Sequence, residues 1–143
     1  MSKRKKLGDI VEIPLGDGLY AYAKLYRQGA LGIYNGKYHN YTEVSKNIDY
    51  FRFITLYRNS LSRLNVVDNI PFNNDEESWQ PDKVVVDAIT NRGSLYHHGE
   101  IIECSYEECK DLEVCAVWEL DHLIDMLNGE TKWDASIRRP KNV

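Results

Sequence analysis

A β-hairpin near the N-terminus constrains the fold more than any other feature of this sequence. Residues 10–13, Ile-Val-Glu-Ile, form a short β-prone run, and Leu19 to Tyr26 forms a second one after the turn signal Gly16-Asp17-Gly18. Apolar runs that flank a Gly/Asp turn are a strong local signal for two antiparallel strands. A chain that begins with such a hairpin is expected to continue into a larger antiparallel sheet.

Further strands are predicted along the chain by short runs of apolar and aromatic residues between turn signals. These runs are 30–34, 50–57, 84–89, 94–97, 101–103 and 114–118. Residues 65–80 contain Pro71 and a polar Asn-Asn-Asp-Glu-Glu run, so we predict a surface loop there with at most one helical turn.

Two helices are predicted in the second half. Ser105 and Glu108 fit the S-x-x-E capping box, which predicts a short helix that ends near Leu112. From Glu119 the apolar residues follow helical spacing, and Asn128-Gly129 supplies a stop signal. The expected fold class is α+β: a curved antiparallel sheet or partial β-barrel with a C-terminal helix packed against it.

The length of 143 residues predicts one domain over residues 7–133, with a basic tail at 1–6 and a loose tail at 134–143. No apolar core follows the basic opening, and no run reaches the roughly 18–20 apolar residues of a membrane span. Cys104, Cys109 and Cys115 fit neither a disulfide framework nor a zinc pair, which favours reduced, mostly buried thiols. A cytoplasmic protein without a membrane partner is therefore expected.

Charge is distributed unevenly behind a net charge of −4. Residues 1–65 hold 11 basic and 5 acidic residues, whereas residues 66–143 hold 7 basic and 17 acidic ones. The span from Glu100 to Glu130 has ten acids and one base, Lys110. A field of one sign attracts an oppositely charged partner and repels a like one, so this half favours a basic partner and disfavours nucleic acid.

Catalytic patterns are weak. No nucleophile lies in a known signature beside a base, and no Gly-rich phosphate loop is present. His97 and His98 fall in a hairpin, where neighbours are expected to point to opposite faces and so not to share a metal. We therefore expect no cofactor, no metal and no enzymatic activity.

Two alternatives remain open. His122 and Asp125 have metal-ligand spacing on a helix, which is compatible with a metal-dependent hydrolase. The run Lys3 to Lys6 and a stripe of tyrosines on one face of the second strand (Tyr20, Tyr22 and Tyr26) would suit a small nucleic-acid-binding β-barrel.

Two blocks of sequence resemble the immunity protein 26 family of bacterial polymorphic toxin systems. The first is residues 8–15, Gly-Asp-Ile-Val-Glu-Ile-Pro-Leu, followed by Gly18, Tyr20 and Tyr22. The second contains Glu108-Cys109, Leu112-Glu113 and residues 116–119, Ala-Val-Trp-Glu, followed by His122. The residues of these blocks that we expect to serve the fold are Gly8, Asp9, Pro14, Gly18, Tyr20 and Trp118.

The resemblance implies a protein that binds and neutralises a toxin encoded by a neighbouring gene. A phosphotriesterase-type activity has also been attached to the family heading, and the hydrolase alternative would correspond to it. An acidic surface would suit a toxin with a basic active-site cleft. The candidate toxin-binding residues are the acids Glu100, Glu103, Asp111, Glu113, Glu119, Asp121 and Asp125. Trp118, Leu120 and Leu123 are expected to anchor the predicted C-terminal helix to the sheet, with Glu119, Asp121 and Asp125 facing outward.

Overall fold

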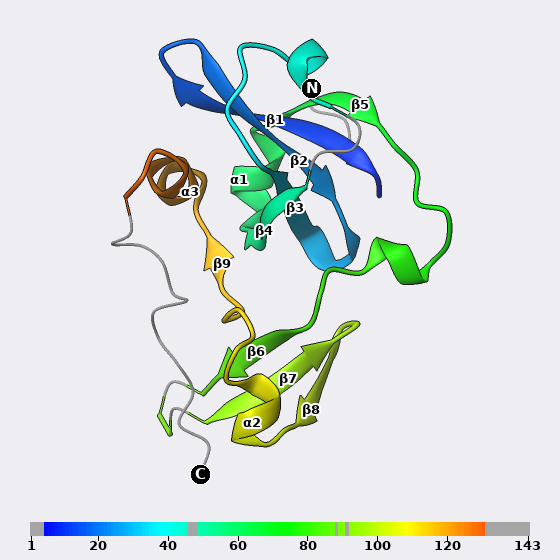
Figure 1. Cartoon of the computed structure of the whole chain (residues 1–143), viewed down its shortest axis with the longest axis vertical. Helices are drawn as coiled ribbons and strands as arrows, with labels where there is room; N and C mark the ends of the chain where they lie inside the picture. The colour runs from blue at the N-terminus through cyan, green and yellow to red at the C-terminus, as the bar shows by residue number, and fades with distance from the viewer. Residues whose placement is uncertain (1–4, 46–48, 88, 91, 131–143) are drawn as a thin grey trace. The chain divides into compact units, whose positions relative to one another are not determined.

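The chain forms two compact units in the computed structural model, which describes residues 5–45, 49–87, 89–90 and 92–130 (Figure 1). The described residues of unit 1 fall within Met1–Gln80 and Val117–Lys132, and those of unit 2 within Pro81–Ala116. The predicted domain 7–133 thus contains residues of both units. The predicted tail 134–143 and residues 1–4 of the basic tail lie outside the described residues.

Unit 1 is built on a six-stranded sheet in the order β5-β1-β2-β3-β4-β9. Its strands are β1 (Asp9–Gly16), β2 (Leu19–Leu25), β3 (Ala30–Tyr34), β4 (Tyr50–Leu56), β5 (Asn65–Asn69) and β9 (Val117–Trp118). Neighbours from β5 through β4 are antiparallel, and β9 pairs with β4 in parallel. The sheet is therefore mixed. Its ends, β5 and β9, do not pair with each other.

The predicted hairpin of β1 and β2 is confirmed, with Ile10 opposite Lys24 and Ile13 opposite Ala21. Its turn uses positive φ angles at Gly16, Asp17 and Gly18. Short helical segments complete unit 1: α1 (Arg58–Ser62), α3 (Leu120–Leu127) and the 3₁₀ turns η1 (Arg27–Gly29), η2 (Tyr41–Glu43) and η3 (Glu76–Ser78). The C-terminal helix was expected and α1 was not. The α+β prediction is confirmed.

The predicted loop 65–80 is wrong in its first part, because residues 65–69 form strand β5. β1 is buried on both faces, with Ile10 and Val11 fully shielded from solvent, and its outer backbone edge needs hydrogen-bond partners. β5 supplies them. All five of its residues are exposed, so the polar composition that suggested a loop is compatible with an edge strand. The single helical turn predicted in this region is η3.

The core of unit 1 lies between the sheet and α3. Helix α3 buries Leu120, Leu123 and Met126, and it contacts β1. Trp118 is 5% exposed, and its carbonyl accepts a hydrogen bond from the backbone N–H of Tyr57 at 3.0 Å. Trp118, Leu120 and Leu123 therefore have the core positions that were predicted.

Unit 2 contains a three-stranded antiparallel sheet in the order β6-β7-β8, followed by a short helix. The elements are β6 (Lys83–Val86), β7 (Gly93–His97), β8 (Glu100–Glu103) and α2 (Tyr106–Cys109). Its small core centres on Val84 and Val114, against which Val86, Cys104 and Leu112 pack.

Three predicted boundaries in unit 2 and at β9 are corrected. β6 ends before residue 89 because Asp87 begins a turn, with its Oδ1 accepting from the backbone N–H groups of Ile89 and Thr90 at 2.8 Å each. α2 ends at Cys109 and does not reach Leu112. The predicted strand 114–118 is reduced to a single parallel bridge at Val114 and to β9.

Candidate functional site

Strand β8 carries two of the predicted partner-binding acids, Glu100 and Glu103. It follows the two-residue turn His98-Gly99, in which both residues have positive φ angles of 47° and 83°. Such angles at both central positions fit the type I′ turn of a tight hairpin. All four residues of β8 are exposed. The hairpin therefore presents both carboxylates to solvent.

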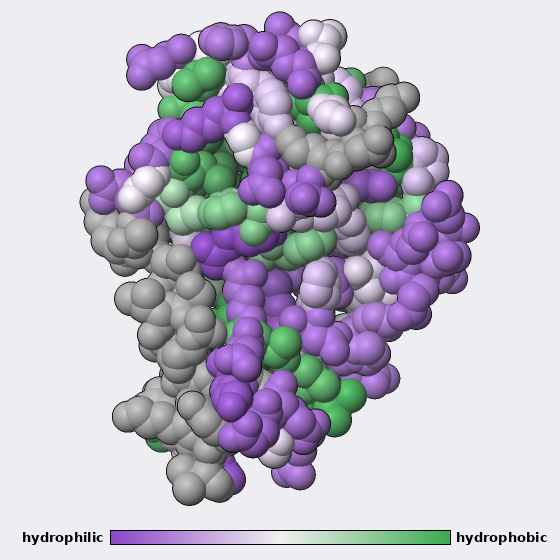
Figure 2. All heavy atoms as spheres, in the orientation of Figure 1, coloured by the Kyte–Doolittle hydropathy of each residue, from purple (hydrophilic) through white to green (hydrophobic). Residues whose placement is uncertain are grey.

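Two isoleucines lie between these acids and are exposed as well. Ile101 is 66% exposed and Ile102 is 42% exposed. Neighbouring residues of a strand point to opposite faces, so each face of β8 displays one isoleucine and one glutamate. In Figure 2, apolar atoms are visible at the surface in the region of β7 and β8. The exposed pair Ile101 and Ile102, flanked by two glutamates on the edge strand of the sheet, is the least expected feature of unit 2.

Sequence reasoning placed a strand at these isoleucines but gave them no role. The available signal was the pattern Glu-Ile-Ile-Glu directly after a tight turn, in the last strand of a small sheet. An outer strand of a sheet has only one neighbouring strand, which leaves its side chains less covered.

The acids after β8 continue the charged surface of unit 2. Ser105 and Glu108 form the predicted capping box: the Ser105 backbone N–H donates to Glu108 Oε1 at 3.1 Å, and the Glu108 N–H donates to Ser105 Oγ at 3.2 Å. Hydrogen bonding of the carboxylate by Ser105, chiefly by its backbone N–H, lowers the pKa of Glu108. Lys110 forms an ion pair with Glu107 at 2.7 Å. Asp111 is exposed and Glu113 is half-buried.

Unit 2 as a whole is strongly acidic over its described span. Residues 81–116 contain eight Asp or Glu residues against three Lys or Arg residues, a net charge of −5. Five acids of β8 and its continuation are exposed: Glu100, Glu103, Glu107, Glu108 and Asp111. A concentrated charge of this kind repels itself in the free protein and attracts cationic groups.

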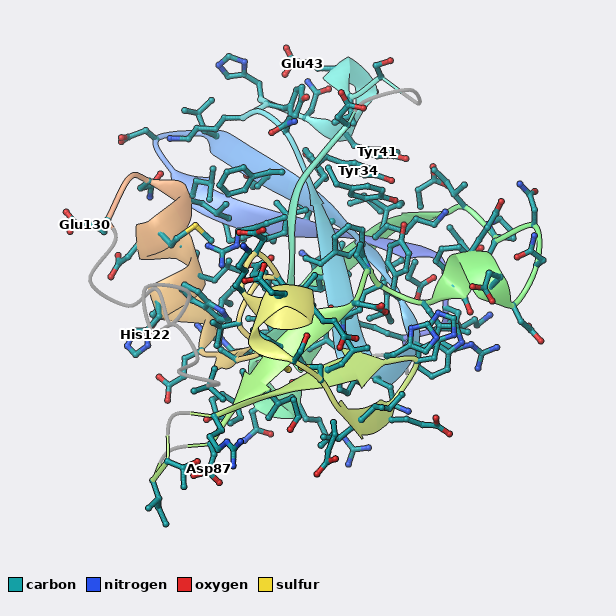
Figure 3. The ribbon with its side chains drawn as sticks, turned by 60° about the horizontal axis from the view of Figure 1, so that its bottom comes forward. Tyr34, Tyr41, Glu43, Asp87, His122 and Glu130 are labelled. Carbon is teal, nitrogen blue, oxygen red and sulfur yellow. The ribbon has the colours of Figure 1, made fainter. Side chains whose placement is uncertain are left out.

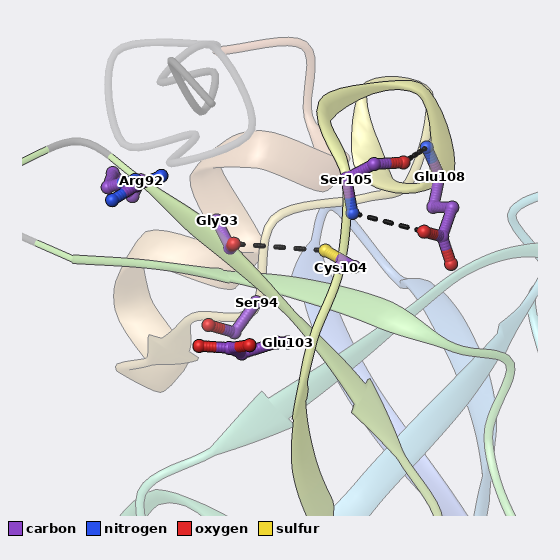
Figure 4. Close-up of a pocket in the computed structure, with 7 residues that line it drawn as sticks. All are labelled: Arg92, Gly93, Ser94, Glu103, Cys104, Ser105 and Glu108. Carbon is purple, nitrogen blue, oxygen red and sulfur yellow. Dashed lines mark hydrogen bonds between the residues drawn. The ribbon is translucent and has the colours of Figure 1, made fainter. Parts of the chain in front are cut away.

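A hollow of about 500 Å³ lies beside β7 and β8 (Figure 4). It is lined by Arg92, Gly93, Ser94, Glu103, Cys104, Ser105 and Glu108. The Cys104 thiol donates to the carbonyl oxygen of Gly93 at 3.8 Å. None of the seven lining residues is a histidine, so no imidazole base is placed in the hollow to activate the thiol. The hollow offers polar contacts next to Glu103.

The other three candidate acids belong to α3 and the residue before it, in unit 1. Glu119 and Asp121 are exposed as predicted, whereas Asp125 is half-buried. The helix is fixed by a hydrogen bond from the Leu120 backbone N–H to Ser60 Oγ at 3.0 Å, and Asp121 lies 4.0 Å from the Arg63 guanidinium. The seven candidate acids are thus divided between the units, with four in unit 2 and three in unit 1.

Gly8 and Asp9, from the first family-like block, form contacts at the start of β1. The Asp9 carboxylate is buried and accepts hydrogen bonds from the Lys6 backbone N–H at 2.7 Å and from Asn69 Nδ2 at 2.8 Å. Gly8 has a φ of +85°, and a Cβ there would lie 2.6 Å from the Ile70 carbonyl oxygen. These contacts join the start of β1 to the end of β5.

The remaining motif residues differ in exposure. Pro14 is exposed on β1. Gly18 has a φ of +75° in the hairpin turn with open space around it. Tyr20 is half-buried and pairs through its backbone with Tyr38. Gly18 and Tyr20 thus contribute to the local backbone structure, whereas the structural role expected of Pro14 stays a prediction.

The tyrosine face of β2 is covered and is not a stacking platform. Tyr22 is fully buried, and its hydroxyl donates to Glu12 Oε2 at 2.8 Å. Its ring packs against Tyr38 and Tyr41, and burial followed by the Glu12 bond raises its pKa. Tyr26 is also buried. Tyr38 and Tyr41 cover the Tyr22 ring. Tyr50, Phe53 and Phe72 cover the Tyr26 ring, so both rings lie inside unit 1.

More tyrosines gather beside this face. The rings of Tyr34 and Tyr50 stack with centroids 5.1 Å apart, and the Tyr41 hydroxyl donates to Asp68 Oδ2 at 2.7 Å (Figure 3). Burial is the main cause of a raised pKa at all three residues. Their hydroxyls are thus engaged within the protein fold.

The expected separation of His97 and His98 is wrong. Their rings stack with centroids 3.9 Å apart and an interplanar angle of 12°. β7 ends at His97, and the left-handed backbone of His98 interrupts the alternation of side chains that a strand would impose. His97 Nδ1 lies 2.6 Å from Asp82 Oδ1.

The pair His122 and Asp125 lies on α3, and Figure 3 shows His122 projecting from that helix. Within the described residues, no group of three or more His, Cys, Asp or Glu side chains could hold a metal ion. No helix in the described part of the chain is long and apolar enough to cross a membrane. Cys104 and Cys115 are half-buried, and neither thiol is part of a disulfide.

Comparison with known proteins yields no relative. No protein-family model matches the chain, and neither the curated proteins nor the solved structures give a significant match. The resemblance to the immunity protein 26 family therefore stays a prediction that rests on the two sequence blocks.

Proposed function

We propose that this chain is a cytoplasmic immunity protein that binds and neutralises a cognate bacterial toxin through the acidic surface of unit 2. The observation that carries the proposal is the β8 strand, on which exposed Glu100 and Glu103 flank exposed Ile101 and Ile102. Contiguous exposed apolar surface rimmed by polar residues marks sites of protein interaction.

The two kinds of side chain have different roles in such an interface. Protein interfaces bury an apolar centre inside a polar rim, and charged residues are depleted from the centre. Ile101 on one face of β8 and Ile102 on the other would each supply an apolar contact. Glu100, Glu103 and Asp111 would supply a negative rim that steers a cationic partner and fixes its orientation.

The charge of the partner follows from the charge of unit 2. Residues 81–116 carry a net charge of −5, so binding a basic surface relieves self-repulsion that the free protein bears. A toxin that handles phosphate needs a basic cleft, and an acidic surface can occupy it in place of substrate. Close charge pairs in one nuclease–inhibitor complex have coupling energies of about 1.5–7 kcal/mol. The resemblance of the two sequence blocks to a toxin-immunity family supports the same function.

Co-expression with the toxin encoded by the neighbouring gene tests the proposal. The chain is expected to restore growth of cells that express the toxin and to co-purify with it. The double variant E100K/E103K should lose protection. A control is E130K, which reverses one charge at an exposed residue of unit 1. Failure of the wild-type chain to bind the toxin or to restore growth would refute the proposal.

A further inference from the structure

No strand pairs with the outer edge of β8 in the described part of the chain. In the sheet order β6-β7-β8, β8 is the last strand and pairs only with β7 among the described residues. The opposite edge of the sheet is covered, because the Val84 N–H donates to the Glu113 carbonyl at 3.0 Å and the Cys115 N–H donates to the Val84 carbonyl at 2.7 Å. An exposed edge strand is a template on which another chain can form hydrogen bonds.

The hairpin geometry defines which backbone groups face outward. His97 and Glu100 are paired residues that flank the His98-Gly99 turn, and the closing bond of such a turn joins the first residue to the fourth. Bonding alternates along an antiparallel ladder, so Glu100 and Ile102 direct their N–H and C=O groups toward β7. Ile101 and Glu103 direct theirs away from the sheet.

The side chains of β8 specify a complementary pattern. Ile101 and Glu103 share one face of the strand, and Glu100 and Ile102 share the other. A strand aligned with residues 100–103 therefore meets acid, apolar, apolar and acid in turn. Its best complement is basic, apolar, apolar and basic, which places an opposite charge beside each glutamate and an apolar side chain beside each isoleucine. This pattern reads the same in both strand directions.

A second copy of the chain is a poor occupant of this edge. Antiparallel pairing of two β8 strands in full register would place Glu100 of each copy opposite Glu103 of the other. Like charges directly opposite each other destabilise a pair of strands. The acidic ends of β8 thus disfavour self-association and select a basic partner.

From this geometry we infer that β8 receives an extended segment of its partner as a fourth strand, and that the segment has a basic-apolar-apolar-basic pattern. Strand addition takes its affinity from main-chain hydrogen bonds and its specificity from alternate side chains. The inference rests on the proposed function for the identity of the partner, which would be the toxin. The recognition chemistry itself depends only on β8.

Two peptides of equal composition separate this inference from the proposed function. The first, acetyl-Thr-Lys-Val-Val-Lys-Thr-amide, has the complementary pattern. The second, acetyl-Thr-Val-Lys-Lys-Val-Thr-amide, places lysine opposite isoleucine. Titration of the full chain, followed by NMR, should show about tenfold tighter binding of the first peptide, which corresponds to about 1.4 kcal/mol.

Amide hydrogen exchange on the same samples measures which backbone N–H groups of β8 are hydrogen-bonded. With the first peptide bound, the amides of Ile101 and Glu103 should become protected, whereas those of Glu100 and Ile102 should already be protected in the free chain. Equal binding of the two peptides, or no new protection at Ile101 and Glu103, would overturn the inference. Neither result concerns the toxin, so the growth assay would still decide the proposed function. Protection of Ile101 and Glu103 that appears without peptide as protein concentration rises would also overturn it, by showing that a second copy occupies the edge.

Discussion

Replacing Gly8 by alanine tests whether the family-like N-terminal block serves the fold through close backbone packing. Gly8 has a φ of +85°, its N–H donates to the Leu25 carbonyl at 2.9 Å, and its carbonyl accepts from the Ile70 N–H at 2.9 Å. An alanine Cβ would lie 2.6 Å from the Ile70 carbonyl oxygen, a distance that requires backbone movement. The same substitution at Gly18 is a matched control, because Gly18 has a φ of +75° but nothing within 4 Å of the added Cβ.

The two variants should differ by the cost of the clash. A left-handed backbone costs a non-glycine residue about 1–2 kcal/mol, and this term applies to both. Overpacking typically costs a further 1–3 kcal/mol, and it applies to Gly8 alone. We therefore expect a loss of about 2–5 kcal/mol in unfolding free energy for G8A and about 1–2 kcal/mol for G18A.

Urea denaturation followed by tryptophan fluorescence measures this difference, since the buried Trp118 belongs to unit 1. Equal losses for G8A and G18A, or a larger loss for G18A, would refute the reasoning. The motif glycine would then owe its role to backbone conformation and not to its contact with the end of β5.

Three further predictions concern the packing and ionisation of single side chains. L123A should lower the free energy of unfolding, measured by calorimetry, by about 2–5 kcal/mol, because Leu123 is fully buried. D121A, at an exposed position of the same helix, should change it by no more than about 0.5 kcal/mol. Similar losses for the two variants would contradict the assignment of the buried and exposed faces of α3. E108Q should lower the thermal midpoint at pH 7. The Ser105 hydrogen bonding that lowers the pKa of Glu108 stabilises the folded state at pH values above 4.5, the ordinary pKa of a glutamate. That difference should shrink as the pH falls through the lowered pKa, and a constant difference down to pH 2 would count against it. Burial raises the pKa of Cys115, so alkylation at pH 8, followed by mass spectrometry, should be slower in the folded chain than in urea; equal rates would oppose this.

Local signals predicted much of the fold. The Gly16-Asp17-Gly18 turn, the Ser105-Glu108 capping box and the apolar spacing of α3 all depend on residues within one or two turns of each other. Such features can be read from a sequence because their stabilising contacts are local. The predicted outward positions of Glu119 and Asp121 follow from the same helical spacing.

The errors arise where distant segments decide the outcome. β5 forms because β1 needs a partner on its outer edge, and nothing in residues 65–69 reveals this need. The tyrosine face of β2 is buried in part by Tyr38 and Tyr41, and the polar sequence around them gives no clear periodicity. The stacking of His97 on His98 depends on a left-handed backbone that ends the strand pattern.

The candidate site was only partly accessible from sequence. Charge counting identified the acids, but it grouped residues of two compact units into one surface. The exposure of Ile101 and Ile102 depends on β8 being the last strand of its sheet, a property of topology.

The affinity of purified chain and toxin, measured by titration calorimetry at low and high salt, tests the central claim most directly. We expect a complex that weakens as salt screens the charges, and at least a tenfold loss of affinity for E100K/E103K, against little change for E130K. Charge reversal at Glu119, Asp121 or Asp125, the candidate acids of unit 1, is also expected to weaken the complex, and the same titration compares their effect on affinity with that of Glu100 and Glu103. If E100K/E103K and E130K bind the toxin as tightly as the wild-type chain at every salt concentration, the acidic surface of unit 2 is not the binding site.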